Sequence, residues 1–186
     1  MTIPIIASVI RGLWFIGEVL HQRQQQVKLL KNLDKNSGRL WDAANAIEPV
    51  GMILGFAGIG RIQTGSGLVA GAGLALLILG IIIRWRAIRD LGRYFTSTVR
   101  IKDNHRLIRT GLYGHLRHPA YTGALVAHLG LGMAFANWYS VALSSIPYLF
   151  AAMYRIHVEE QVLVAEFGQE YLDYARRTKR LIPKVY

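Results

Sequence analysis

Four residues whose side chains suit ligand binding lie together in the segment GLYGHLRHPAYTG, residues 111–123. They are Arg117, His118, Pro119 and Tyr121. The arginine, histidine and tyrosine offer charge and hydrogen-bonding groups, and the proline restricts the backbone between them. Because the segment stands where a basic stretch gives way to an apolar one, we expect a binding site at a membrane surface.

The sequence around these residues predicts a loop that leads into a helix. Gly111 and Gly114 permit backbone turns, so residues 104–116 should be irregular or only briefly helical. Pro119 suits the first turn of the following helix, and His118 then falls near its N-cap. The free N–H groups at such a helix start can bind a carboxylate or another anion.

A second polar group comes from Arg155 and Glu159, which lie four residues apart and therefore share one helix face. An ordinary exposed ion pair, worth about 0.3–0.5 kcal/mol, is the alternative to a role in the site. Arg84 ends an apolar stretch and is followed by Arg86, Arg89 and Arg93, and one of these four pointing inward would add a second guanidinium. The arginine fork binds a carboxylate through two hydrogen bonds, so these residues indicate an anionic substrate.

Other kinds of site are excluded or disfavoured. The chain has no cysteine, which excludes disulfides, thiolate metal sites and a cysteine nucleophile. His115 and His118 form one weak pair with His105 nearby, whereas membrane di-iron enzymes need several histidine boxes, so we expect no metal. His128 lies inside an apolar stretch and is expected to be a packed, hydrogen-bonded histidine. No Gly-x-Gly-x-x-Gly motif follows a strand, so we expect no Rossmann domain.

The elements that must position these groups are apolar helices. The 186 residues are 52% hydrophobic, and the apolar residues are clustered rather than scattered. A membrane helix needs about 20 mostly apolar residues. Five candidate spans cover residues 3–20, 41–59, 67–83, 121–135 and 139–157. The sequence therefore predicts an all-α integral membrane protein with about five transmembrane helices.

Polar and small residues suggest how these spans pack. Arg11 and Glu18 share a face of the first span, which favours an intramembrane or interfacial pair over a role in substrate entry. This first span is the weakest, and the alternative is that it lies in the interface. Gly67 and Gly71 form a small-xxx-small pair suited to close helix packing. A short connection that contains Asn137 and Trp138 separates the last two spans, which forces an antiparallel hairpin.

The distribution of charge predicts the orientation. Of the 22 Lys and Arg residues, 20 fall in three regions that a five-helix layout places on one side, residues 21–40, 84–117 and 155–184. The positive-inside rule then puts the N-terminus outside and the C-terminus in the cytoplasm. In a soluble protein a net charge of +11 would suggest nucleic-acid binding. Here it indicates basic loops that face anionic lipid or an anionic ligand, and we expect no nucleic-acid partner.

A single membrane domain is expected. Its parts are three N-terminal spans (1–83), a cytoplasmic connector (84–118), a helical hairpin (119–158), and a cytoplasmic C-terminal helix and tail (159–186). No helix breaker follows Pro147 until Gly168, so the last helix of the hairpin should protrude from the bilayer. Phe167, Tyr171 and Tyr174 would form an apolar stripe there, either on a plain amphipathic helix or against a ligand.

Together these residues resemble the isoprenylcysteine carboxyl methyltransferases and the related phospholipid methyltransferases of membranes. The likeness covers roughly residues 81–186, and it is specific because its parts match in order and spacing. The matching positions are Arg84, LGRYFT (91–96), Leu107, Ile108, Gly111, Tyr113, RHPAY (117–121), Gly123, Arg155, Glu159, Glu160, Phe167, Gly168, Tyr171, Tyr174 and RLIP (180–183). The compact five-span layout most resembles the short prokaryotic members.

This resemblance implies that S-adenosylmethionine binds in a cytoplasmic pocket formed by the connector and the last two helices. The cofactor contacts that it implies are Arg100, His105, Arg106, Leu107, Ile108, Tyr113, His118, Pro119, Ala120 and Tyr121. Glu159 would face the cationic cofactor, while Arg155 and Arg84 would hold the substrate carboxylate. These last three are the residues expected to carry the chemistry.

The implied reaction transfers a methyl group to the carboxylate of a lipophilic, isoprenoid or isoprenylcysteine-like substrate in a prokaryotic cell membrane. A carboxylate is already ionised at pH 7, so the protein needs no general base and acts by positioning. Arg155 favours this substrate over the amine of a phospholipid N-methyltransferase. Two further alternatives stay open, a sterol-reductase-like enzyme that uses NADPH and a non-catalytic membrane scaffold.

Overall fold

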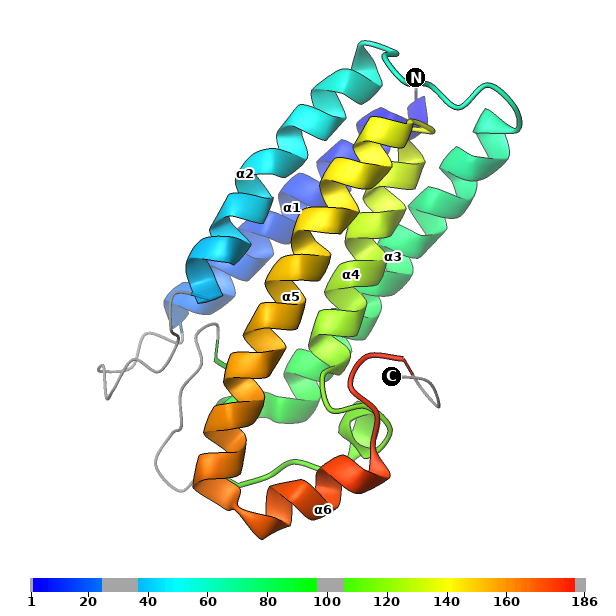
Figure 1. The fold of residues 1–186 in the computed structure, drawn as a ribbon. Helices are drawn as coiled ribbons and strands as arrows, with labels where there is room; N and C mark the ends of the chain where they lie inside the picture. The colour runs from blue at the N-terminus through cyan, green and yellow to red at the C-terminus, as the bar shows by residue number, and fades with distance from the viewer. Residues whose placement is uncertain (1, 25–36, 97–105, 183–186) are drawn as a thin grey trace.

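The computed structural model describes residues 2–24, 37–96 and 106–182, and helices dominate it (Figure 1). Its elements are α1 (Thr2–Gln24), α2 (Ser37–Phe56), α3 (Ser66–Leu91), η1 (Gly92–Tyr94), η2 (Gly111–Gly114), α4 (Pro119–Ala134), α5 (Trp138–Phe167) and α6 (Gln169–Arg177). The helices α1 to α5 form a bundle, and α6 lies across one end of it. Within the described ranges the only strand-like pairing is two isolated bridges, so the predicted all-helical class is confirmed.

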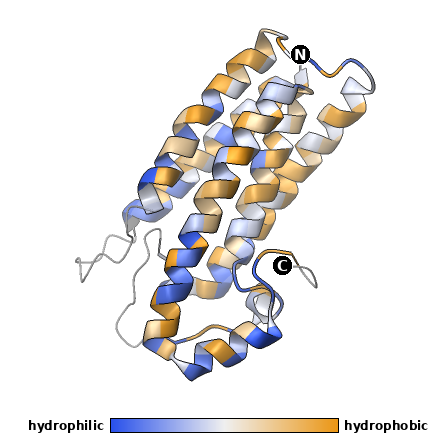
Figure 2. Ribbon diagram, in the orientation of Figure 1, coloured by the Kyte–Doolittle hydropathy of each residue, from blue (hydrophilic) through white to orange (hydrophobic). Residues whose placement is uncertain are grey.

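Apolar residues cover most of the bundle's length, and polar residues gather at the end that carries α6 (Figure 2). In the part of the chain that is described, three helices are long and apolar enough to cross a membrane, at Thr2–Arg23, Ser66–Tyr94 and Trp138–Phe167. The other two predicted spans are helical as well, in α2 and α4, although α4 extends only about 24 Å. Five transmembrane crossings therefore remain a prediction.

The helices alternate in direction along the bundle. The ends of α1, α3 and α5 lie at the same end as the beginnings of α2 and α4 (Figure 1). The described parts of the three basic regions adjoin this end, as the charge distribution predicted. Which side of a membrane this end faces remains a prediction.

The α4–α5 hairpin and the length of α5 agree with what the sequence predicts. Asn137 caps α5 by accepting a hydrogen bond from Ser140 N at 3.0 Å, and its Nδ2 donates to Ile59 O at 2.6 Å. α5 then continues to Phe167 and ends at Gly168, whose φ of 52° is left-handed. Since the chain bends there, the predicted apolar stripe is divided between α5 and α6.

α3 and α4 approach each other through glycines. A Cβ atom at Gly80 would lie 2.6 Å from Gly123 O of the facing helix, so neither side could carry a larger residue at this contact. The predicted packing pair, Gly67 and Gly71, is wrong, because both are exposed and a Cβ there would meet no atom within 4 Å. Close packing through small residues occurs, but on the face of α3 that meets α4.

We expect Gly80→Ala to lower the free energy of unfolding by about 1–3 kcal/mol, because the added methyl group overlaps the α4 backbone. Thermal unfolding in detergent measures this loss. The matched control is Gly71→Ala on the same helix, where the methyl group meets nothing and alanine is the better helix former. An equal loss of stability in both variants would contradict the packing described.

Buried charges inside the bundle pair between helices rather than along α1. Arg11 Nε lies 2.7 Å from Glu48 Oε1 of α2, and Arg11 Nη2 donates to Asn45 Oδ1 at 2.8 Å. Glu18 accepts instead from Arg84 of α3, with 2.8 Å between Nη2 and Oε2. The pair predicted on α1 is thus wrong in its partners, since each charge finds the opposite charge on a neighbouring helix.

His128 is a packed residue of the core, as predicted. Its ring stacks on that of Tyr148 with centroids 3.4 Å apart. Its Nδ1 lies 2.6 Å from Glu48 Oε2. Among the described residues, no group of three or more His, Asp and Glu side chains is arranged to hold a metal ion.

Candidate functional site

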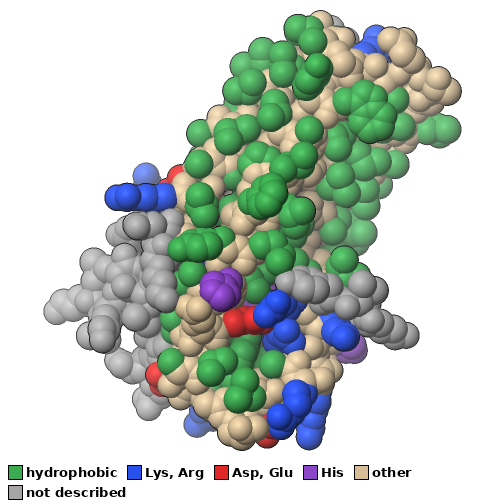
Figure 3. Space-filling model, viewed as in Figure 1, with side chains coloured by type: hydrophobic (Ala, Val, Ile, Leu, Met, Phe, Trp, Pro, Cys, Tyr) green, Lys and Arg blue, Asp and Glu red, His purple; other side chains and the backbone are tan. Residues whose placement is uncertain are grey.

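A pocket opens at the end of the bundle that carries α6, between the ends of α1, α3 and α5 and the segment that precedes α4. The space between its walls, counted out to the open mouth and including solvent there, is about 1160 Å³. Hydrophobic side chains cover most of the face of the bundle in Figure 3, and charged ones gather at this end.

Most of the predicted site residues line this one pocket. They are Arg84, Arg106, Leu107, Ile108, Tyr113, His118, Ala120, Tyr121, Arg155 and Glu159. Pro119 is buried at the first position of α4 and does not line it. The predicted contacts of Arg100 and His105 lie outside the described residues.

The start of α4 has the predicted form. Pro119 begins the helix, and His118 is its N-cap. However, Pro119 has no N–H, and the N–H of Tyr121 donates to His118 O at 3.1 Å. The prediction that this helix start binds an anion through its N–H groups is therefore wrong at these two positions, and side chains must supply the recognition.

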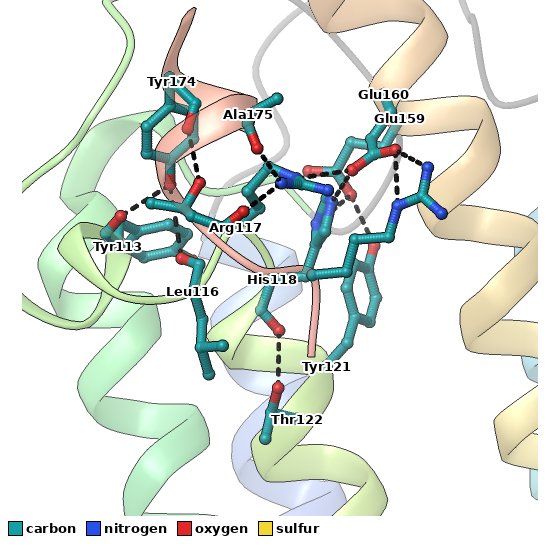
Figure 4. A network of polar contacts seen from close by, with 12 residues as sticks. Tyr113, Leu116, Arg117, His118, Tyr121, Thr122, Glu159, Glu160, Tyr174 and Ala175 are labelled. Carbon is teal, nitrogen blue, oxygen red and sulfur yellow. Dashed lines mark hydrogen bonds and ion pairs between the residues drawn. The ribbon is translucent and has the colours of Figure 1, made fainter. Parts of the chain in front are cut away.

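Glu160 joins this helix start to the C-terminal segment (Figure 4). Its Oε1 accepts from Arg117 Nε at 2.9 Å and lies 3.3 Å from His118 Nε2, while its Oε2 accepts from Arg180 Nη2 at 2.7 Å. Arg117 also donates to Ala175 O at 2.7 Å. One half-buried carboxylate thus holds three basic side chains and fixes one wall of the pocket. The sequence matched Glu160 to a family position but assigned it no role.

A chain of hydrogen bonds crosses the pocket wall from α5 to α4 and back. Arg155 Nε donates to Tyr121 Oη at 3.0 Å, and Tyr121 Oη donates to Glu159 Oε2 at 3.0 Å (the Tyr121–Glu159 bond is drawn in Figure 4). Arg155 is only 5% exposed, so the alternative of an ordinary exposed ion pair with Glu159 does not describe it. Instead, the Tyr121 hydroxyl connects the two predicted functional residues.

Arg84 points inward, as the second-guanidinium hypothesis required, but its charge is balanced. Its guanidinium forms two hydrogen bonds to Glu18 of α1, and its Nη1 donates to Ala120 O at 3.3 Å. The sequence did not predict this partner, because Glu18 and Arg84 lie 66 residues apart. Of the two predicted carboxylate-binding arginines, Arg84 is thus already paired with a carboxylate of the protein.

Aromatic residues complete the wall. Tyr174 Oη donates to Tyr113 O at 2.7 Å, and burial raises the pKa of Tyr174 to about 12. Burial and the nearby Glu159 carboxylate raise the pKa of Tyr113 well above its usual value, so both phenols stay neutral. Trp41 of α2 also lines the pocket, with its ring 5.9 Å from that of Tyr121. Sequence reasoning missed Trp41, because no local pattern links it to Tyr121 of α4, 80 residues away.

The chain is similar to known membrane methyltransferases. The model of the isoprenylcysteine carboxyl methyltransferase (ICMT) family matches residues 73–165, which is half of the chain. Over 120 residues the chain is 36% identical to protein-S-isoprenylcysteine O-methyltransferase B of Arabidopsis thaliana, covering 63% of this chain and 60% of that protein. The protein-S-isoprenylcysteine O-methyltransferase of Schizosaccharomyces pombe is 34% identical over 114 residues, which are 60% of this chain and 48% of that one.

A solved structure shares the fold. The structure of the eukaryotic intramembrane Ras methyltransferase ICMT superposes with a TM-score of 0.64 at 25% identity. The superposition covers 78% of this chain and 52% of that chain. The chain thus spans about half to three fifths of the length of these relatives, and the matched family region contains Arg84, Tyr121, Arg155 and Glu159.

Proposed function

Because the chain belongs to the isoprenylcysteine carboxyl methyltransferase family, we propose that it methylates the carboxylate of a lipophilic, isoprenylcysteine-like substrate with S-adenosylmethionine as the methyl donor. The observation that carries this proposal is the placement of Arg155 and Glu159 in one pocket at the polar end of an apolar bundle. We further propose that this pocket faces the cytoplasm of a prokaryotic cell, with the N-terminus outside, as the charge distribution favours.

The residues of the pocket suit this cofactor. Glu159 is partly exposed to the pocket, where a carboxylate favours a positively charged sulfonium. The segment from Arg106 to Ile108, with Tyr113 and Ala120, offers backbone and aromatic surface for an adenosine group. When bound, the cofactor supplies a methyl group on a cationic sulfur. Arg100 and His105 remain proposed contacts from the adjoining connector.

Arg155 would hold the substrate carboxylate. Its guanidinium is buried beside the Tyr121 hydroxyl, so it can replace the water around the anion without protonating it. Since the carboxylate is already ionised, no side chain has to remove a proton. The residues thus act by aligning the two reactants, with the apolar part of the substrate among the helices. Arg84, neutralised by Glu18, would be a secondary contact.

Cofactor binding separates this proposal from its alternatives. Isothermal titration calorimetry of the purified chain in detergent should show binding of S-adenosylmethionine and none of NADPH. Binding of NADPH alone would favour a sterol-reductase-like enzyme instead. Binding of neither cofactor would favour a non-catalytic scaffold and would contradict the proposed function.

A further inference from the structure

Tyr171 carries a buried hydroxyl that finds no partner among the described residues. The residue is 2% exposed, and its Oη accepts and donates no hydrogen bond. It nevertheless lines the pocket. Buried polar groups in folded proteins are nearly always hydrogen-bonded, so an exception in the wall of a pocket indicates a group that is satisfied when the pocket is filled.

The neighbouring tyrosine of α6, Tyr174, provides a comparison, because its hydroxyl is hydrogen-bonded within the protein. Tyr174 lies one turn later, with its ring 6.0 Å from that of Tyr171, and it also lines the pocket. Its hydroxyl donates to Tyr113 O within the protein. The two residues therefore share a helix, a pocket and a degree of burial, and they differ in whether the protein itself satisfies the hydroxyl.

The charges around Tyr171 keep its hydroxyl protonated, so that it can donate a hydrogen bond. Burial and the Glu160 and Glu159 carboxylates raise its pKa, outweighing the opposing effect of Arg117, so the phenol retains its proton. Glu160 already accepts from Arg117 and Arg180. A molecule bound in the pocket would supply an acceptor for the Tyr171 proton.

We propose that the Tyr171 hydroxyl is a further ligand-binding group of the pocket and donates a hydrogen bond to an acceptor on the bound methyl donor. This inference rests on the proposed function, because it takes the occupant of the pocket to be an S-adenosyl compound. The acceptors that such a compound offers are its amino-acid carboxylate, its ribose hydroxyls and its adenine nitrogens.

The test is the affinity of Tyr171→Phe for S-adenosylhomocysteine, measured by calorimetry on the full chain in detergent. We expect a Kd about 3- to 10-fold weaker than that of the wild type, as one hydrogen bond is lost. The ligand-free variant should unfold at the same temperature as the wild type or higher, because no bond within the protein is removed. The matched control, Tyr174→Phe, should unfold at a lower temperature without ligand, because it loses the bond to Tyr113.

A second probe, 5′-methylthioadenosine, lacks the amino-acid group and locates the contact. If Tyr171→Phe weakens the binding of S-adenosylhomocysteine alone, the hydroxyl binds the amino-acid part. If it weakens the binding of both probes, the hydroxyl binds the adenosine part. Unchanged affinity for S-adenosylhomocysteine in Tyr171→Phe would overturn this inference and leave the proposed function standing. A wild-type chain that binds no S-adenosylhomocysteine would overturn both.

Discussion

Arg155→Gln is expected to lower kcat/KM for methyl transfer to a lipophilic carboxylate by about 30- to 5000-fold. Arg155 is buried beside the Tyr121 hydroxyl, and losing a buried, hydrogen-bonded charge from a binding site costs about 2–5 kcal/mol. Steady-state kinetics with a prenylated cysteine as substrate measure the loss. Binding of S-adenosylhomocysteine should be largely retained, since the proposed partner of Arg155 is the substrate and not the cofactor.

Two further arginine variants make this result specific. Arg155→Lys keeps the charge but loses the planar fork, so its kcat/KM should fall between those of Arg155→Gln and the wild type. Arg86→Gln is the control for a change of charge alone, because Arg86 is exposed on α3, pairs with Asp90 and does not line the pocket. Wild-type activity in Arg155→Gln would contradict the site, as would an equal loss in Arg86→Gln.

Glu159→Gln is expected to weaken the binding of S-adenosylmethionine about tenfold more than that of S-adenosylhomocysteine. The two ligands differ in the methyl group on sulfur and in the positive charge that it brings, and a carboxylate facing that charge in a partly exposed pocket would favour the cation by about 1.4 kcal/mol. The ratio of the two dissociation constants, measured for wild type and variant, isolates this effect from any general damage to the pocket.

The adjacent residue offers a matched control. Glu160→Gln removes a carboxylate of the same size, but one that faces Arg117, His118 and Arg180 rather than the pocket. It should lower the unfolding temperature and weaken the binding of both ligands equally, so that the ratio of their dissociation constants stays unchanged. If Glu159→Gln also leaves the ratio unchanged, Glu159 does not face the sulfonium.

The sequence predicted the helices better than their contacts. Glycine and proline positions and the lengths of the apolar runs placed the hairpin and the end of α5 at Gly168 correctly. They could not show which face of α3 meets α4, because that helix is apolar all round and its hydrophobic pattern has no direction. The tight contact accordingly falls at Gly80 and not at the predicted Gly67 and Gly71.

For the candidate site, too, the residues were predicted better than the contacts between them. The resemblance selected residues that line one pocket, including Tyr121, Arg155 and Glu159. It did not reveal that Glu18 balances Arg84, because that pair joins two helices far apart in the sequence. Nor could it separate Tyr171 from Tyr174, which share a helix face and differ only in whether the folded chain satisfies the hydroxyl.

The central claim is that this pocket transfers a methyl group to a carboxylate, and product chemistry tests it most directly. The purified chain is incubated with methyl-labelled S-adenosylmethionine and an S-prenylated N-acetylcysteine, and the lipid product is treated with base. We predict a labelled product that releases methanol on this treatment, as a methyl ester does, and no labelling when the substrate carboxylate is converted to an amide. A base-stable label, or no transfer despite binding of S-adenosylmethionine, would contradict the account.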